Sequence, residues 1–309
     1  MAVTVKTTDY QKFGKCVAIS NGEAEVFVTV DMGPRIIRCG FVGGVNMMFS
    51  DDTFEVITTH PSMETHYYKG AKWVNFGGHR LWASPEKMPN TYYPDNNPVE
   101  YTLLENGAIF TQEPQTQNGV QMQMQVTMEE YGRIEVRHFI KNISDAEKTL
   151  SVWALSVLNQ GGLEIIPNNT LDTYLLPNRR IVAWPYTNLA DHRVHWGEKY
   201  ITLKQDPSAQ ANFKLGLDNH AGTALYVLED TVFVNQYTHD QNAVYDDFGV
   251  SFETYTSKDI LEMETLSPIQ TLKPGETAEH TEHWSLYKTS KMPDGKNEAE
   301  VERFVQQYL

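Results

Sequence analysis

The segment Trp73–Glu86, WVNFGGHRLWASPE, brings together residue types that sugar-binding sites use. It holds an imidazole, a guanidinium and two indole rings: His79, Arg80, Trp73 and Trp82. Aromatic rings cover the apolar C–H face of a sugar ring, and the fixed donors of an arginine bind its hydroxyl groups. Gly77 and Gly78, which come directly before His79, allow a sharp turn of the backbone. In the alternative interpretation, both indoles anchor the core and His79 caps a turn.

A second candidate is Leu261–Pro268, LEMETLSP, which carries two carboxylates two residues apart. On a β-strand, Glu262 and Glu264 point to the same face. Mutual repulsion raises at least one of their pKa values, and a carboxylate that titrates near neutral pH can act as a general base. The alternative is a solvated outer face, the commoner environment of glutamate on an edge strand.

A third candidate is the acidic segment Phe233–Tyr255, which includes the turn 239–247. Clustered carboxylates could bind Ca²⁺ through oxygen ligands, although the spacing of an EF-hand is missing. An equal alternative is a hairpin loop whose His239 and Tyr245 contact a substrate. A simple solvated loop is favoured over both.

A local basic cluster lies in Leu176–Lys199, where arginines alternate with Trp184, Tyr186 and Trp196. The whole chain is acidic, because 25 Lys and Arg residues face 40 Asp and Glu residues, a formal net charge of −15. Phosphate backbones and anionic lipids require clustered positive charge, so nucleic acid and membrane partners are not expected. An anionic or polyhydroxylated sugar fits this cluster better, and arginines paired with surface carboxylates are the structural alternative.

Several classes of protein are excluded by missing motifs. The sequence contains no GxSxG elbow, P-loop, GxGxxG, HExxH or CxxC pattern, so we predict neither a cofactor nor a metal site. The two cysteines, Cys16 and Cys39, are expected to be free thiols. No apolar segment has the length of a signal peptide or a membrane span, which predicts a cytoplasmic protein. The oligomeric state is not predicted.

The elements that must position these residues are mostly β-strands. Alternation of apolar and polar residues recurs along the chain, as in Gln121–Val126 (QMQMQV), and predicts more than a dozen strands. Helical spacing is found only in Asn297–Tyr308, with Asn297 as the expected N-cap. The region Thr59–Asn97 breaks the alternation and predicts a long functional loop. No linker divides the 309 residues, so residues 1–309 are predicted to form one all-β domain, an antiparallel sandwich with a short C-terminal helix.

Three motifs resemble those of the galactose mutarotase-like superfamily. They are VDMGPRIIRCGF, GGHRLWASPE and LEMETLSPIQTLKPGETAEHTEHW, and the resemblance extends from about Ala18 to Tyr287. It implies an antiparallel β-supersandwich that binds a sugar on a concave face. In the aldose 1-epimerases of this superfamily, a glutamate in a late strand is the general base and a histidine is the acid. The pattern L-x-x-E-T followed by proline assigns the base to Glu264, and the early loop assigns sugar binding to His79 and Arg80.

The sequence departs from this family on one strand. In mutarotases, the histidine that acts as the acid lies on a central strand. The corresponding segment here, Ser151–Leu158, has Trp153 and no histidine. The acid would then be His79, His239 or His138.

Three functional hypotheses follow. The first is a cofactor-independent aldose 1-epimerase-like isomerase, with Glu264 as base and His79 or His239 as acid. The second is a non-catalytic carbohydrate-binding protein, and the third is a glycoside hydrolase that uses Glu264 and Glu253. The residues expected to bind the small-molecule sugar are Arg80, Trp82, Asn75, Trp73, Glu262 and Tyr245.

Overall fold

The computed structural model describes residues 2–309, and the alternation read from the sequence becomes the inner and outer faces of strands. In β10 (Val120–Met128), Met122, Met124 and Val126 are buried, while the intervening glutamines are partly exposed. Because successive side chains on a strand point to opposite faces, one row of each strand enters the core. The predicted all-β fold is confirmed.

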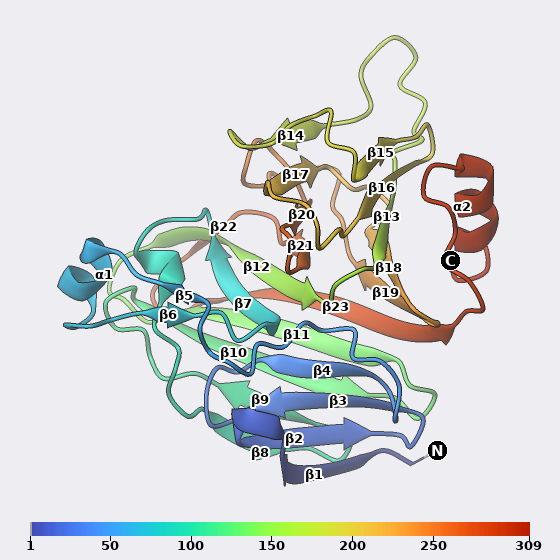
Figure 1. The fold of residues 1–309 in the computed structure, drawn as a ribbon. Helices are drawn as coiled ribbons and strands as arrows, with labels where there is room; N and C mark the ends of the chain where they lie inside the picture. The colour runs from blue at the N-terminus through green and yellow to red at the C-terminus, as the bar shows by residue number, and fades with distance from the viewer. Residues whose placement is uncertain (1) are drawn as a thin grey trace.

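The strands form two large antiparallel sheets and one small one (Figure 1). The first large sheet has eleven strands, in the order β1 (Thr4–Asp9), β2 (Lys15–Ser20), β3 (Ala24–Thr29), β4 (Ile36–Phe41), β7 (Gly78–Ser84), β12 (Lys148–Leu158), β21 (Leu261–Leu266), β20 (Phe252–Thr256), β17 (Phe213–Leu217) and β14 (Ile181–Ala183), with β22 (Gln270–Leu272) paired to β12. The cavity described below lies on its central strands.

The second sheet has ten strands and faces the first. Its order is β15 (Val194–Trp196), β16 (Tyr200–Lys204), β13 (Leu163–Pro167), β18 (Thr223–Leu228), β19 (Thr231–Tyr237), β23 (Thr277–Lys288), β11 (Ile134–Asn142), β10, β9 (Gly107–Thr111) and β8 (Glu100–Leu103). A separate pair is formed by β5 (Ile57–Thr58) and β6 (Trp73–Val74).

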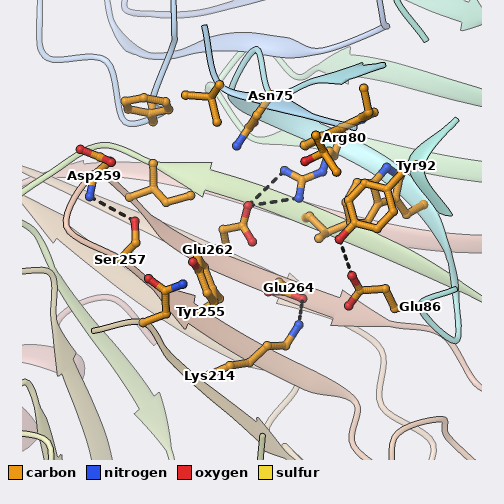
Figure 2. Close-up of a pocket in the computed structure, with 18 of the residues that line it drawn as sticks. Asn75, Arg80, Glu86, Tyr92, Lys214, Tyr255, Ser257, Asp259, Glu262 and Glu264 are labelled. Atoms are coloured by element: carbon orange, nitrogen blue, oxygen red, sulfur yellow. Dashed lines mark hydrogen bonds and ion pairs between the residues drawn. The ribbon is translucent and has the colours of Figure 1, made fainter. Parts of the chain in front are cut away.

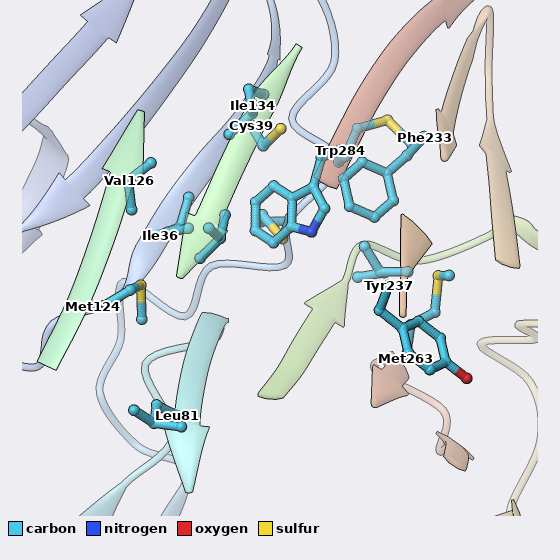
Figure 3. Packing of buried hydrophobic residues seen from close by; sticks show 14 of the residues in the cluster. Ile36, Cys39, Leu81, Met124, Val126, Ile134, Phe233, Tyr237, Met263 and Trp284 are labelled. Atoms are coloured by element: carbon cyan, nitrogen blue, oxygen red, sulfur yellow. The ribbon is translucent and has the colours of Figure 1, made fainter. Parts of the chain in front are cut away.

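The core fills the space between the two large sheets (Figure 3). Trp284 of β23 is fully buried there, and its indole meets the ring of Phe233 edge-on, with the ring centroids 5.2 Å apart. Burial of one such large apolar side chain contributes about 1.5–3 kcal/mol. Cys16 and Cys39 are buried free thiols, as expected.

The C-terminal helix is also confirmed. Helix α2 (Glu298–Val305) begins after Asn297, whose side chain accepts a hydrogen bond from the Glu300 amide. Its apolar side, with Val301 and Phe304, covers strands β13, β18 and β19. The helix therefore shields the outer face of one end of the second sheet.

The region Thr59–Asn97 differs from the long loop that was expected. It contains helix α1 (Pro61–His66), strands β6 and β7, and the 3₁₀ turn η2 (Asn90–Tyr92); the other 3₁₀ turn, η1 (Gln11–Phe13), lies near the N-terminus. The positive φ angles of Gly77 and Gly78 provide the predicted turn, but a strand follows it at once. Within residues 2–309, no helix has the length and apolar character needed to cross a membrane.

Candidate functional site

Strand β7 separates two residues that are adjacent in sequence. Its register with β12 pairs His79 with Ser156 and Arg80 with Leu155. Since neighbouring side chains on a strand point to opposite faces, His79 enters the core between the sheets, whereas Arg80 lies on the outer, concave face. The alternation of this one strand decides which member of the HR pair can meet a ligand.

The concave face holds a cavity of about 870 Å³, a size typical of ligand sites (Figure 2). Aromatic residues from several strands and loops form much of its wall: Phe49, Trp73, Trp82, Tyr92, Trp153, Trp184, Tyr186 and Tyr255. Five of the six residues expected to bind sugar (Asn75, Arg80, Trp82, Trp73 and Glu262) line it together with Glu264. Segments distant in sequence are thus brought to one surface.

Arg80 and Glu262 form a buried ion pair in this wall. Both terminal nitrogens of Arg80 donate to Oε1 of Glu262, at 3.1 Å each. The guanidinium also lies over the rings of Trp82 and Trp73, 4.3 and 5.3 Å from their centroids. These contacts fix the orientation of the guanidinium plane, so its remaining donor surface is preorganised.

Glu264 takes part in a second charged group that the sequence did not indicate. Its Oε2 accepts hydrogen bonds from the Lys214 ammonium and the Trp153 indole, both at 2.9 Å. The same ammonium lies 2.7 Å from Oε2 of Glu253. Strand register explains the meeting, because Glu253 is paired directly with Glu264 across β20 and β21. The indole of Trp153 therefore helps to hold Glu264 in place.

Burial and charge act in opposite directions in this group. Desolvation raises the pKa of Glu264 above its ordinary value, and the Lys214 ammonium opposes this rise only in part. Desolvation lowers the pKa of Lys214, but the Glu264 and Glu253 carboxylates outweigh it and raise that pKa overall. Lys214 thus remains an ammonium ion. Within residues 2–309, the second oxygen of Glu264, Oε1, has no hydrogen-bond partner.

The expected acid His79 lies outside this cavity. Its Nδ1 is 2.9 Å from the Ser156 hydroxyl, and its Nε2 is 2.7 Å from Nε2 of His138. Desolvation and the neighbouring His138 lower the pKa of His79 well below its ordinary value. Desolvation likewise lowers the pKa of His138 to about 4 and that of His280 to about 3. These histidines belong to a neutral cluster in the core.

The expected residues His239 and Tyr245 also lie away from the cavity wall. Their rings stack with centroids 5.2 Å apart, beside the turn that contains Asp218 and His220. No histidine lines the cavity among the residues that the structure describes.

Sequence reasoning missed Lys214, Trp153 and Tyr255 as members of the wall. A lysine inside the apolar strand FKLGL was the available signal for Lys214, since an unpaired ammonium is not found in a buried strand. Trp184 and Tyr186 of the basic segment line the cavity, whereas Arg193 is paired with Asp191. Two aromatic residues of that segment, Trp184 and Tyr186, belong to the site, whereas Trp196 and the arginines do not.

Comparison with known proteins places the fold. No family model and no curated protein matches the chain. Among solved structures, a galactose mutarotase-like protein from Lactobacillus casei ATCC 334 has a TM-score of 0.57 at 10% identity, covering 88% of this chain and 100% of that one. Galactose 1-epimerase from Lactobacillus acidophilus NCFM has a TM-score of 0.51 at 12% identity, covering 93% and 100%.

A third solved structure is that of a TPR-domain containing protein from Parabacteroides distasonis ATCC 8503. Its TM-score is 0.59 at 13% identity, and the match covers 91% of this chain but 48% of that one. The chain thus spans about half the length of that protein. Taken with the sheet topology, these similarities confirm the galactose mutarotase-like fold that the sequence motifs predicted.

Proposed function

We propose that the protein binds a small-molecule sugar or sugar derivative in the cavity of the first sheet, with residues 1–309 acting as one sugar-binding domain. The observation that carries the proposal is the meeting of the Arg80–Glu262 pair, the Lys214–Glu264 pair and the indole rings of Trp73 and Trp82 in a single wall. One solved structure with this fold is of a galactose 1-epimerase, which supports the same ligand class.

The wall offers both kinds of contact that a sugar needs. Indole faces suit the C–H side of the ring, and burial of that side removes apolar surface from water. Charged donors and acceptors suit the hydroxyl groups, since hydrogen bonds to charged partners are stronger than those between neutral groups. Because Trp82 and Arg80 are already stacked, their side chains lose little conformational freedom when a ligand binds.

A second candidate function, interconversion of the anomers of an aldose, is favoured by Glu264. Its raised pKa and its unpartnered Oε1 suit a base that takes the proton of the anomeric hydroxyl. Ring opening then places negative charge on the ring oxygen, which the Lys214 ammonium would stabilise. In this proposal the Lys214 ammonium faces the ring oxygen in place of the histidine acid that was expected, since His79 and His239 lie elsewhere.

Glycoside hydrolysis by Glu264 and Glu253 is less well supported. A hydrolase needs a sugar carbon or a water molecule between its two carboxylates. Here the Lys214 ammonium lies between them, 2.9 and 2.7 Å from the two carboxylate oxygens. The ammonium is paired with both groups and fills the space that the substrate would need.

Binding is tested by isothermal titration calorimetry with a panel of monosaccharides, sugar acids and sugar phosphates. We expect at least one to bind, and Arg80→Lys to weaken it because lysine lacks the planar fork and the stacking. Trp196→Phe, outside the cavity, is the matched control. Absence of binding across the panel, or equal losses in both variants, contradicts the proposal.

Catalysis is tested separately by NMR of freshly dissolved anomers of any sugar that binds. Faster interconversion that Glu264→Gln abolishes supports a general base, with the surface residue Glu279 changed to Gln as control. Binding without acceleration leaves a carbohydrate-binding protein and rejects the isomerase.

A further inference from the structure

A second cluster of titratable groups lies outside the cavity, where two connections between strands meet. Asp218 and His220 lie in the turn between β17 and β18, and His239 follows the end of β19. Their potential ligand atoms all lie within 4.8 Å of one another. We propose that Asp218, His220 and His239 bind a divalent transition-metal ion of the Zn²⁺ class.

The distances in this cluster fit ligands around one ion. Nε2 of His220 lies 3.3 Å from Oδ2 of Asp218, in a long hydrogen bond, and Nε2 of His239 lies 3.3 Å from Oδ1 of the same carboxylate. This is longer than the usual N–H···O hydrogen bond of about 2.7–3.2 Å. Two ligands of a tetrahedral zinc ion, each about 2.0–2.1 Å from the metal, lie roughly 3.3–3.4 Å apart. Two imidazoles and one carboxylate are also a common ligand set for such ions.

His239 provides an independent observation. Its side chain is only 2% exposed, yet neither ring nitrogen has a hydrogen-bond partner within residues 2–309. A buried polar group without a partner is costly, and a metal–nitrogen bond would compensate for it. The ring lies nearly parallel to those of His220 and Tyr245, with centroids 4.9 and 5.2 Å away.

The backbone around the proposed ligands is fixed by one buried amide. The Asn169 side chain donates to the carbonyl oxygen of Asp218 at 2.8 Å and accepts from the amide of His220 at 3.0 Å. Such supporting contacts are typical of metal sites. One cation is nearby, since Arg180 lies 3.4 Å from Asp218, but it is half exposed and also donates to the Gly249 carbonyl oxygen.

A second group of potential ligands lies in the core and consists of His79, His138 and Glu282. It differs from the group at Asp218 in its hydrogen bonds. There the two imidazole nitrogens are 2.7 Å apart, a hydrogen-bond distance. The Glu282 carboxylate already accepts from Thr265, Asn235 and Trp284. That group is satisfied by the protein, whereas in the group at Asp218 both ring nitrogens of His239 lack a hydrogen-bond partner within residues 2–309.

The proposed ion would tie the turn after β17, in the first sheet, to the end of β19, in the second. Binding to the native state alone stabilises it, so the ion should raise the melting temperature. The test is calorimetric titration of chelator-treated protein (residues 1–309) with ZnCl₂, with MgCl₂ as the oxygen-preferring comparison. We expect one Zn²⁺ per chain, a higher melting temperature, and no comparable binding of Mg²⁺.

Variants assign the site. Loss of a supporting contact commonly weakens metal binding by about 10–100-fold, so loss of a ligand in His220→Ala or His239→Ala should weaken it by at least about tenfold. His192→Ala is the matched control, since this exposed histidine also faces a carboxylate, Asp206, at 3.0 Å. His220 is partly exposed, so His220→Ala carries the test if His239→Ala fails to fold.

Co²⁺ adds a readout of geometry, because tetrahedral and octahedral sites absorb differently. We expect the tetrahedral spectrum in the wild type and in His192→Ala, and its loss in His220→Ala. The proposal is overturned if no saturable Zn²⁺ binding occurs, or if His220→Ala binds as tightly as the wild type.

Discussion

The two faces of the first sheet both bury charged and titratable groups, but they do so differently. On the inner face, Thr265 of β21 donates to Glu282 of the second sheet, a carboxylate that is surrounded by donors and fully satisfied within the protein. On the outer face, Glu264 keeps Oε1 unpartnered within residues 2–309, and the indole nitrogen of Trp73 is also without a partner. A satisfied polar network specifies a core, whereas an unsatisfied one is available to a ligand. The comparison of these two carboxylates favours the outer face as the place of the ligand site.

The largest expected effect is on the cavity side. Lys214→Met leaves Glu264 and Glu253 buried without their counter-ion, and loss of one member of a buried ion pair costs about 3–5 kcal/mol. We expect the free energy of unfolding, measured by urea titration, to fall by that amount. It should partly recover at acidic pH, where protonation removes the carboxylate charges.

The control for this change is Lys288→Met, which breaks the exposed pair with Asp230. Surface pairs contribute about 0–1 kcal/mol, so this variant should unfold almost like the wild type. Equal decreases in the free energy of unfolding of the two variants would show that the cavity charges are solvated. The outer face would then not bury its charges.

The next effect is a pH dependence that arises in the core. The pKa of His138 is lowered by desolvation to about 4 in the folded protein, against about 6.5 in the unfolded chain. Between these values the unfolded state binds the proton and the native state does not, so stability falls as pH drops. By pH 4 the loss from this group reaches about 3 kcal/mol.

The measurement is urea unfolding of the wild type and of His138→Gln from pH 7 to pH 4. The variant should show a shallower decline on acidification. His195→Gln, on the edge strand β15, is the control and should keep the wild-type slope. The carboxylates of the cavity, whose pKa values are raised, act with the opposite sign, since they favour the native state as pH falls.

The smallest expected effect is on the affinity for a sugar, and it tests whether the outer face binds the ligand. Glu262→Gln keeps the shape of the side chain but removes the charge that orients Arg80, so we expect about tenfold weaker sugar binding, equivalent to about 1.4 kcal/mol. Calorimetric titration checks the affinity, and Glu135→Gln, on the second sheet, serves as control. An unchanged affinity would exclude the Arg80–Glu262 pair from the ligand contacts.

The strand pattern made most of the fold predictable, but the site was only partly so. Alternation at Met122 and Met124 and the N-cap at Asn297 are local signals, and both were interpreted correctly. His79 and Arg80 were placed in one turn because the Gly-Gly pair suggested it. The strand that begins at Gly78 instead sends their side chains to opposite faces. Lys214 was missed because only the pairing of β17, β20 and β21 brings it to Glu264, and a single strand does not reveal its partners.

The distribution of indole rings gives the molecule a built-in optical reporter. The chain has six tryptophans, and Trp73, Trp82, Trp153 and Trp184 line the cavity. Most of the intrinsic fluorescence should therefore originate there, where the Lys214 ammonium lies 4.9 and 4.8 Å from two ring centroids. A ligand that enters should change the emission, so compounds can be screened without labels before any reaction is known.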